Sequence, residues 1–187
     1  MNPRQSYFSK KLGRSFSGDT LSRAVDRVIK NQDRYYKLLR STGEPGIDNL
    51  IDSIHRSNFF MAHCHSHHHY ASGLAEHSLG VYDRMRRLAK GYELEQKDII
   101  LTALLHDLCS ASKEDWPHIF GKHGLNSRLI AEHFLPGLSS NVKEAIQCHM
   151  HRPSMKNAAR NPLWALVHKA DHADAATSPG RMLKFMR

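Results

Sequence analysis

The residues best suited to chemistry are His106 and Asp107, which stand together inside an apolar stretch. Residues 99–105 are mostly aliphatic and contain no Gly or Pro, which predicts a buried helix. An imidazole and a carboxylate buried in such a helix are costly unless something pairs with them. A metal ion would pair with both, and the two oxygens of Asp107 would let it bridge two ions. A buried His–Asp hydrogen bond that only packs helices is the alternative that the dipeptide alone leaves open.

Further metal-ligand side chains occur on both sides of this pair. They are His77 before it, and His123, His149 and Asp171 after it. This order, H…HD…H…H…D, resembles that of the HD-domain metal-dependent phosphohydrolases. Residues 67–81 also resemble the motif HHxYxxGLxEHSLxV, which marks the group of that superfamily that includes 3′→5′ exonucleases. The resemblance extends from about residue 38 to about residue 176 and covers most of the chain.

The resemblance implies a metal centre built from six side chains. A first metal would be held by His77, His106, Asp107 and Asp171, and a second by His123 and His149, with Asp107 bridging. These ligands suit Fe, Mn, Co, Ni or Zn without selecting strongly among them, so we expect divalent transition metals, two per chain. Asp107 is the expected catalytic residue. The expected substrate-binding residues are His68, Lys113 and Arg152.

Two positions depart from the pattern of the family. Relatives often carry Lys three residues after the Asp of the His–Asp pair, where this chain has Ser110; Lys113 follows three residues later. Many relatives also have two consecutive histidines where this chain has His149, Met150 and His151. The first departure weakens the expectation of phosphate binding more than that of metal binding.

A histidine-rich tract precedes the first motif. It reads His63-Cys64-His65-Ser66-His67-His68-His69. Short tracts of His and Cys can bind metal by themselves, so a separate zinc site is one interpretation. The resemblance favours another, a loop beside the active site with His67 and His68 at its edge and residues 63–65 exposed. Further along, the His-Gly pair before a helix favours His123 over His133 as a ligand.

The spacing of apolar residues predicts an all-α protein. Helices are expected at about residues 19–40, 47–57, 74–90, 95–109, 123–134 and 141–150, and from residue 162 onward. No alternating strand pattern, internal repeat or Gly-rich phosphate loop is present in the sequence. We therefore expect an HD-domain helical bundle of about six or seven helices. A single domain would span residues 19–176, between a basic flexible tail at residues 1–18 and a basic tail at residues 177–187.

The composition adds constraints on partners and location. A net charge of +9 fits a phosphorylated small molecule, a nucleotide or a nucleic acid as the partner. No apolar run approaches the roughly 20 residues of a membrane span, so no membrane partner is expected. Three irregularly spaced cysteines favour a reducing cytoplasm over a disulfide framework. The oligomeric state does not follow from the sequence.

These features predict a metal-dependent phosphohydrolase. It would cleave a phosphomonoester or phosphodiester bond of a nucleotide or nucleic acid through a metal-activated water. The alternative is a metal-binding regulatory or nucleic-acid-binding module of the same fold with weakened catalysis. Ser110 and the altered residues after His149 favour that alternative, whereas the complete set of six ligands opposes it.

Overall fold

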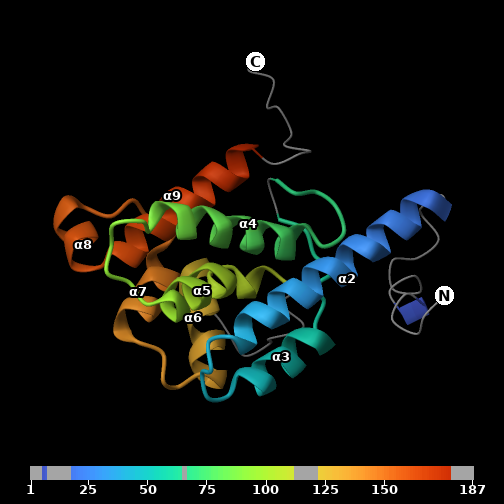
Figure 1. The fold of residues 1–187 in the computed structure, drawn as a ribbon, viewed down its shortest axis with the longest axis horizontal. Helices are drawn as coiled ribbons and strands as arrows, with labels where there is room; N and C mark the ends of the chain where they lie inside the picture. Colours follow the sequence, from blue (N-terminus) through green and yellow to red (C-terminus); the bar gives the residue numbers. More distant parts are fainter. Residues whose placement is uncertain (1–5, 8–17, 65–66, 112–121, 178–187) are drawn as a thin grey trace.

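The computed structural model describes residues 6–7, 18–64, 67–111 and 122–177. Within these ranges the chain forms helices joined by loops, with no strand (Figure 1). The elements are α2 (Gly18–Arg40), α3 (Ile47–Arg56), α4 (Gly73–Leu88), α5 (Gln96–Leu105), the 3₁₀ helix η1 (Leu108–Ser110), α6 (His123–Phe134), α7 (Ser140–Cys148), α8 (Met155–Arg160) and α9 (Pro162–Thr177). The prediction of an all-α bundle is confirmed.

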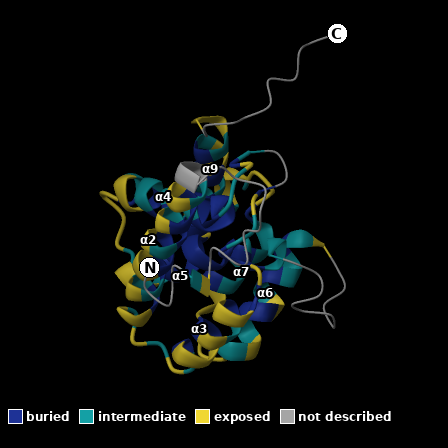
Figure 2. Ribbon diagram, turned by 90° about the vertical axis from the view of Figure 1, so that its right-hand side faces the viewer, coloured by how far each residue is buried: buried dark blue, intermediate teal, exposed yellow. Residues whose placement is uncertain are grey.

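Helix α5 lies at the centre of the bundle. Every residue from Ile99 to Leu105 is buried, because the helix is apolar all round and must be covered on all sides. Helices α2, α4, α6, α7 and α9 all contact it, and Figure 2 shows the buried segments gathered around it. The His106–Asp107 pair follows directly at the carboxyl end of this helix, so the pair lies in the interior of the bundle.

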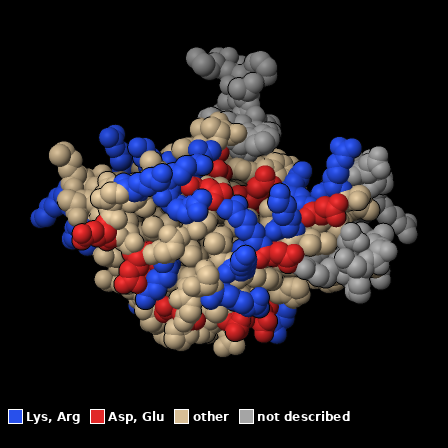
Figure 3. All heavy atoms as spheres, in the orientation of Figure 1, with Lys and Arg blue, Asp and Glu red and all other residues tan. Residues whose placement is uncertain are grey.

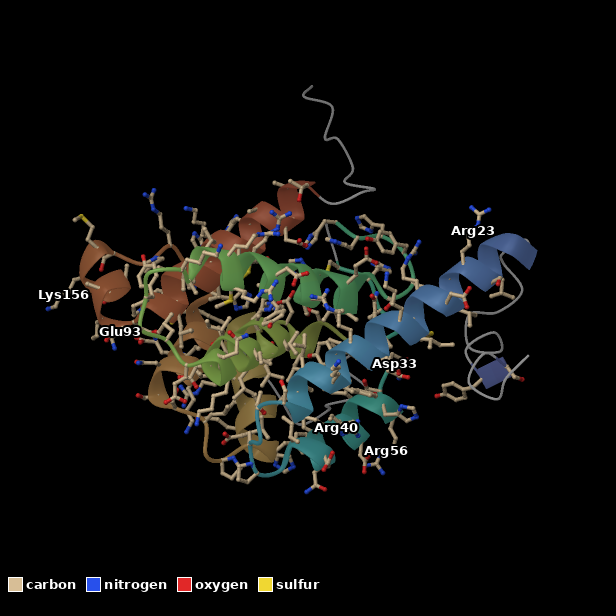
Figure 4. All side chains as sticks on the ribbon, viewed as in Figure 1. Arg23, Asp33, Arg40, Arg56, Glu93 and Lys156 are labelled. Atoms are coloured by element: carbon tan, nitrogen blue, oxygen red, sulfur yellow. The ribbon has the colours of Figure 1, made fainter. Side chains whose placement is uncertain are left out.

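The long helix α2 and the short helix α3 close one side of the core. Helix α2 buries Val25, Val28, Tyr35 and Leu39 along one face, and the Tyr35 hydroxyl donates to the carbonyl oxygen of Leu104. This bond satisfies a carbonyl in the last turn of α5, where no helical N–H is available to it. Charged side chains such as Arg23, Arg56 and Lys156 project from the periphery instead (Figure 4).

Helix positions agree with the sequence-based expectations, and their ends differ by a few residues. The helix expected at 95–109 ends at Leu105, and η1 follows after Asp107. Helix α8 was not predicted, because its six residues carry no buried side chain and so show no apolar periodicity. Its N-cap is Ser154, whose hydroxyl accepts from the backbone N–H of Asn157.

The two expected tails lie almost entirely outside the described residues, and the single-domain boundaries stay a prediction. Among the described residues, no helix combines the length and apolar character needed to cross a bilayer.

Candidate metal centre

The six predicted ligands come together in the interior, although they are spread over almost 100 residues of sequence. His77 lies in α4 and Asp171 in α9, and these two helices pack side by side. The other four stand at helix ends: His106 and Asp107 after α5, His123 at the start of α6, and His149 just after α7. The side chains of His77, His106 and His149 are completely buried.

Asp107 stands between two groups of histidines. Its Oδ2 lies 3.8 Å from His77 Nε2 and 3.7 Å from His106 Nε2. Its Oδ1 lies 2.6 Å from His123 Nε2 and 3.4 Å from His149 Nε2. Each oxygen of the carboxylate therefore faces its own pair of imidazoles, which is the arrangement that a bridging ligand between two ions requires.

The first group of ligands is closed by Asp171. Its Oδ1 lies 3.1 Å from His77 Nε2, and His77 Nε2 lies 3.3 Å from His106 Nε2. Three sets of candidate ligand atoms each lie within 4.8 Å of one another. They are His77, His106 and Asp107; His106, His149 and Asp171; and Asp107, His123 and His149. Atoms this close can share a metal ion.

Backbone carbonyls orient two of the imidazoles. His106 Nδ1 donates to the carbonyl of Ala103, and His149 Nδ1 donates to that of Ile146, each at 2.8 Å. Both rings therefore turn Nε2 toward the cluster, and an imidazole held through Nδ1 in this way binds metal through Nε2. The buried Nε2 of His149 makes no hydrogen bond within the described part of the chain. A buried nitrogen left in this state fits a metal ion as its partner.

The side chains of the cluster have pKa values shifted in opposite directions. Burial opposes the ionisation of Asp107, yet the surrounding imidazoles of His106, His123 and His149 hold its pKa well below the usual range. Burial lowers the pKa of His106 to about 4, so this ring is neutral at pH 7. The hydrogen bond from His123 to Asp107 raises the pKa of His123 to about 10. Side chains with such divergent pKa values are typical of functional sites.

His77 carries the opposite shift from His106. Burial lowers its pKa, but hydrogen bonds to Asp171 and Asp174 outweigh burial and raise the pKa to about 10. Without metal, protons on His77 and His123 therefore balance the carboxylates at neutral pH. A metal ion would replace these protons with its own positive charge.

A glycine lets α6 approach close enough to deliver His123. A Cβ at Gly124 would lie 2.2 Å from the carbonyl oxygen of Gln147 in α7, so any side chain there would push the two helices apart. The His-Gly pair thus has a physical basis: His123 faces Asp107 because Gly124 permits the contact between α6 and α7. His133, its competitor, is exposed and packs on Phe134.

The three predicted substrate-binding residues lie in different environments or outside the described residues. His68 is buried beside Asp174, with its Nε2 3.5 Å from Asp174 Oδ2 and its ring centroid 5.5 Å from that of His77. Arg152 is exposed, in the segment that follows α7. Lys113 lies outside the described residues. Ser110 is partly exposed in η1.

One feature of the site was misjudged from the sequence, and a second lies beside the predicted ligands. Cys64 was expected to be exposed, and this was wrong: only 4 % of its surface is accessible. Its sulfur belongs to a set of possible ligand atoms with His67, His68 and His77, all within 4.8 Å of one another. Asp174 is a further residue of the site: its Oδ2 lies 3.0 Å from His77 Nδ1, so it is a neighbour of the ligands and not a solvent-facing residue. Its spacing of three residues from Asp171 was the available signal.

The comparisons with known proteins agree with this geometry. The HD domain family matches residues 74–176, which is more than half of the chain and includes all six predicted ligands. The chain therefore belongs to the HD-domain superfamily of metal-dependent phosphohydrolases. No curated protein and no solved structure matches it. Membership of the smaller group with the HHxYxxGLxEHSLxV motif stays a prediction.

Proposed function

We propose that this protein is a metal-dependent phosphohydrolase that cleaves a phosphomonoester or phosphodiester bond of a nucleotide or nucleic acid. The observation that carries the proposal is the position of Asp107, whose two oxygens face separate pairs of imidazoles. A carboxylate between two sets of imidazoles suits two metal ions better than one. Membership of the HD superfamily supports the same reaction class.

The proposed ligands divide into two sets that share Asp107. One set is His77, His106, Asp107 and Asp171, and the other is His123, His149 and Asp107. Two divalent ions at such a site supply Lewis acidity and lower the pKa of a water molecule that serves as the nucleophile. Nitrogen and carboxylate donors accept Fe, Mn, Co, Ni or Zn.

The charge of the site favours an anionic substrate. The six proposed ligands include only two carboxylates, Asp107 and Asp171. With two divalent ions bound, their formal charge leaves the centre net positive, which attracts a phosphoryl group and stabilises its transition state. We propose Lys113 and Arg152 as further phosphate contacts. His68 would act at the edge of the centre, next to His77 and Asp174.

The net charge of +9 supports a nucleotide or nucleic acid as the substrate. On the face shown in Figure 3, however, basic and acidic side chains alternate, so the positive charge there does not form one continuous patch. We therefore give more weight to a nucleotide or another phosphorylated small molecule than to a long nucleic acid. A cytoplasmic location would suit such a substrate.

The test is the metal content of protein purified without a metal-affinity step, measured together with hydrolysis of two chromogenic substrates. These are bis(p-nitrophenyl) phosphate, a diester, and p-nitrophenyl phosphate, a monoester. We expect about two transition metals per chain. We also expect metal-dependent release of nitrophenol from one of the two substrates. Absence of metal after reconstitution with Mn²⁺, Fe²⁺, Co²⁺, Ni²⁺ and Zn²⁺ would contradict the proposal.

A second candidate is a metal-binding module with weakened catalysis. The observation that favours it is Ser110, which stands where relatives often have a lysine able to bind phosphate. Metal binding without hydrolysis of either substrate, or of a panel of nucleotides, would support this reading. Changing Ser110→Lys would then be informative, since gain of hydrolysis would identify the missing cation as the cause.

A further inference from the structure

A carboxylate outside the six proposed ligands contacts the nitrogen of the His77 ring that points away from the other ligands. His77 Nε2 faces Asp171 at 3.1 Å, while His77 Nδ1 faces Asp174 Oδ2 at 3.0 Å. Asp171 and Asp174 are three residues apart in α9 and thus lie on one face of the helix. The two carboxylates therefore contact opposite nitrogens of one imidazole.

We propose that Asp174 is the positioning residue of the metal centre, which fixes His77 so that its Nε2 is the nitrogen that binds metal. An imidazole coordinates through an unprotonated nitrogen, and a hydrogen bond at the other nitrogen selects both the tautomer and the ring orientation. This inference rests on the proposed metal centre and adds to it a residue that does not itself bind the metal.

The other two buried histidines show what His77 lacks. His106 and His149 are held by carbonyls three residues earlier, those of Ala103 and Ile146. Both stand at helix ends, where such carbonyls have no helical partner. His77 lies within α4, where the helix uses its own carbonyls. It therefore needs an acceptor from elsewhere in the fold. Asp174 Oδ2 of α9 lies 3.0 Å from His77 Nδ1 and is nearer than His67 Nε2, which lies at 3.3 Å.

Asp174 is itself held in place by α4. Arg84 Nε donates to Asp174 Oδ1 at 3.1 Å, and Arg84 Nη2 donates to the hydroxyl of Thr177 at 2.5 Å. Arg84 follows His77 by seven residues, two turns along the same face of α4. One oxygen of Asp174 thus binds the guanidinium and the other binds the imidazole, so that the carboxylate cannot rotate without losing a contact.

The packing leaves room for this carboxylate at one glycine. A Cβ at Gly80 would lie 2.3 Å from Asp174 Oδ1 and 2.8 Å from its Cγ, so a side chain there would displace the carboxylate. Gly80 lies between His77 and Arg84 in α4. Behind Asp174 is a cavity of about 570 Å³, lined among others by Arg27, Lys30 and Arg84.

The first test compares metal affinity in Asp174→Ala and Asp174→Asn with the wild type, by competition with a chromogenic chelator for Zn²⁺. We expect Asp174→Ala to bind about 10–100-fold more weakly, as is typical when a carboxylate behind a ligating histidine is removed. Asp174→Asn keeps an acceptor oxygen and should recover part of the loss. The matched control is Asp83→Ala, which removes a carboxylate paired with Arg34 at 2.5 Å on the surface of α4.

The second test reports on the ring itself. In the Co²⁺-loaded wild type, each coordinated imidazole should give a shifted exchangeable N–H proton signal. We expect Asp174→Ala to lose the signal of His77 Nδ1–H, whereas Asp83→Ala keeps it. Gly80→Ala serves as a further variant if Asp174→Ala folds poorly. Ala favours the helix more than Gly does, so a lower metal affinity in Gly80→Ala would reflect displacement of Asp174.

The outcomes separate this inference from the proposed function. Wild-type protein that binds metal, together with unchanged affinity and unchanged N–H signals in Asp174→Ala, would overturn the positioning role alone. Wild-type protein that binds no metal would overturn both the metal centre and the role of Asp174. Loss of affinity in Asp174→Ala and in Gly80→Ala, with the control unaffected, would establish it.

Discussion

His123 Nε2 lies 2.6 Å from Asp107 Oδ1, so the first residue of α6 reaches the carboxylate that follows α5. The other oxygen of Asp107 faces His77 and His106 at 3.8 and 3.7 Å. The two groups of imidazoles are therefore joined through one carboxylate. Its removal should affect both groups, whereas removal of a histidine from one group should affect that group alone.

Asp107→Ala should empty the centre. We expect the metal content to fall from about two ions per chain to nearly none and hydrolysis to fall by about 10³-fold or more, because both ions lose a charged ligand. Elemental analysis and the nitrophenyl phosphate assays measure these two effects. Asp48→Ala is the control, since Asp48 is an exposed carboxylate paired with Arg40 at 3.2 Å. Unchanged metal content in Asp107→Ala would remove the basis of the proposed site.

His123→Ala should remove one metal and leave the other. The four ligands His77, His106, Asp107 and Asp171 stay intact in this variant, so we expect about one ion per chain instead of two. His133→Ala is a matched control, because His133 lies on the same helix but is exposed and outside the cluster. If His123→Ala and wild type held equal amounts of metal, the assignment of a second ion to His123 and His149 would be wrong.

The order of ligand residues could be predicted from the sequence because they occur in motifs with fixed neighbours. Gly124 next to His123 is one such neighbour, and its close contact with α7 gives the pair a physical basis. The partners that orient the ligands could not be predicted in the same way. Asp174 contacts His77 from 97 residues away, and the carbonyls of Ala103 and Ile146 leave no mark in side-chain identity.

In the fold, too, the helices with a regular apolar pattern could be predicted, and the features without such a pattern could not. Helix α5 was evident because six of the seven residues 99–105 are apolar, and α3 because its apolar residues recur on one face. Helix α8 was missed since it buries nothing. The burial of Cys64 was also missed, because a cysteine among histidines suggests an exposed metal-binding loop, whereas tertiary packing encloses it.

Metal binding should release protons. His77 and His123 both have their pKa raised to about 10 in the metal-free protein, so both are protonated at pH 8. Coordination displaces one proton from each, whereas His106, with its pKa lowered to about 4, releases none. We therefore expect about two protons per chain on saturation with Zn²⁺ at pH 8, and an overall affinity that falls as the pH falls.

Isothermal titration calorimetry in buffers of different ionisation enthalpy counts these protons. The His123→Ala variant supplies the internal control, since it should release about one proton instead of two. A wild-type release near zero at pH 8 would show that the two imidazoles are already neutral before metal binds.

Gly124→Ala should weaken the contact that brings His123 to Asp107. The added Cβ would lie 2.2 Å from the carbonyl oxygen of Gln147, and a backbone oxygen cannot move aside as a flexible side chain can. Ala favours a helix over Gly by about 1 kcal/mol, but the forced separation of α6 and α7 should cost about 1–3 kcal/mol and outweigh that gain. Urea unfolding of the metal-free protein measures this difference in stability. The control is Leu129→Ala, which truncates a partly exposed side chain on α6 and should change stability by less.

Because His123 moves with α6, the second metal should also bind more weakly in Gly124→Ala. A variant that is as stable as the wild type and retains both metals would show that the close approach of α6 and α7 is not needed.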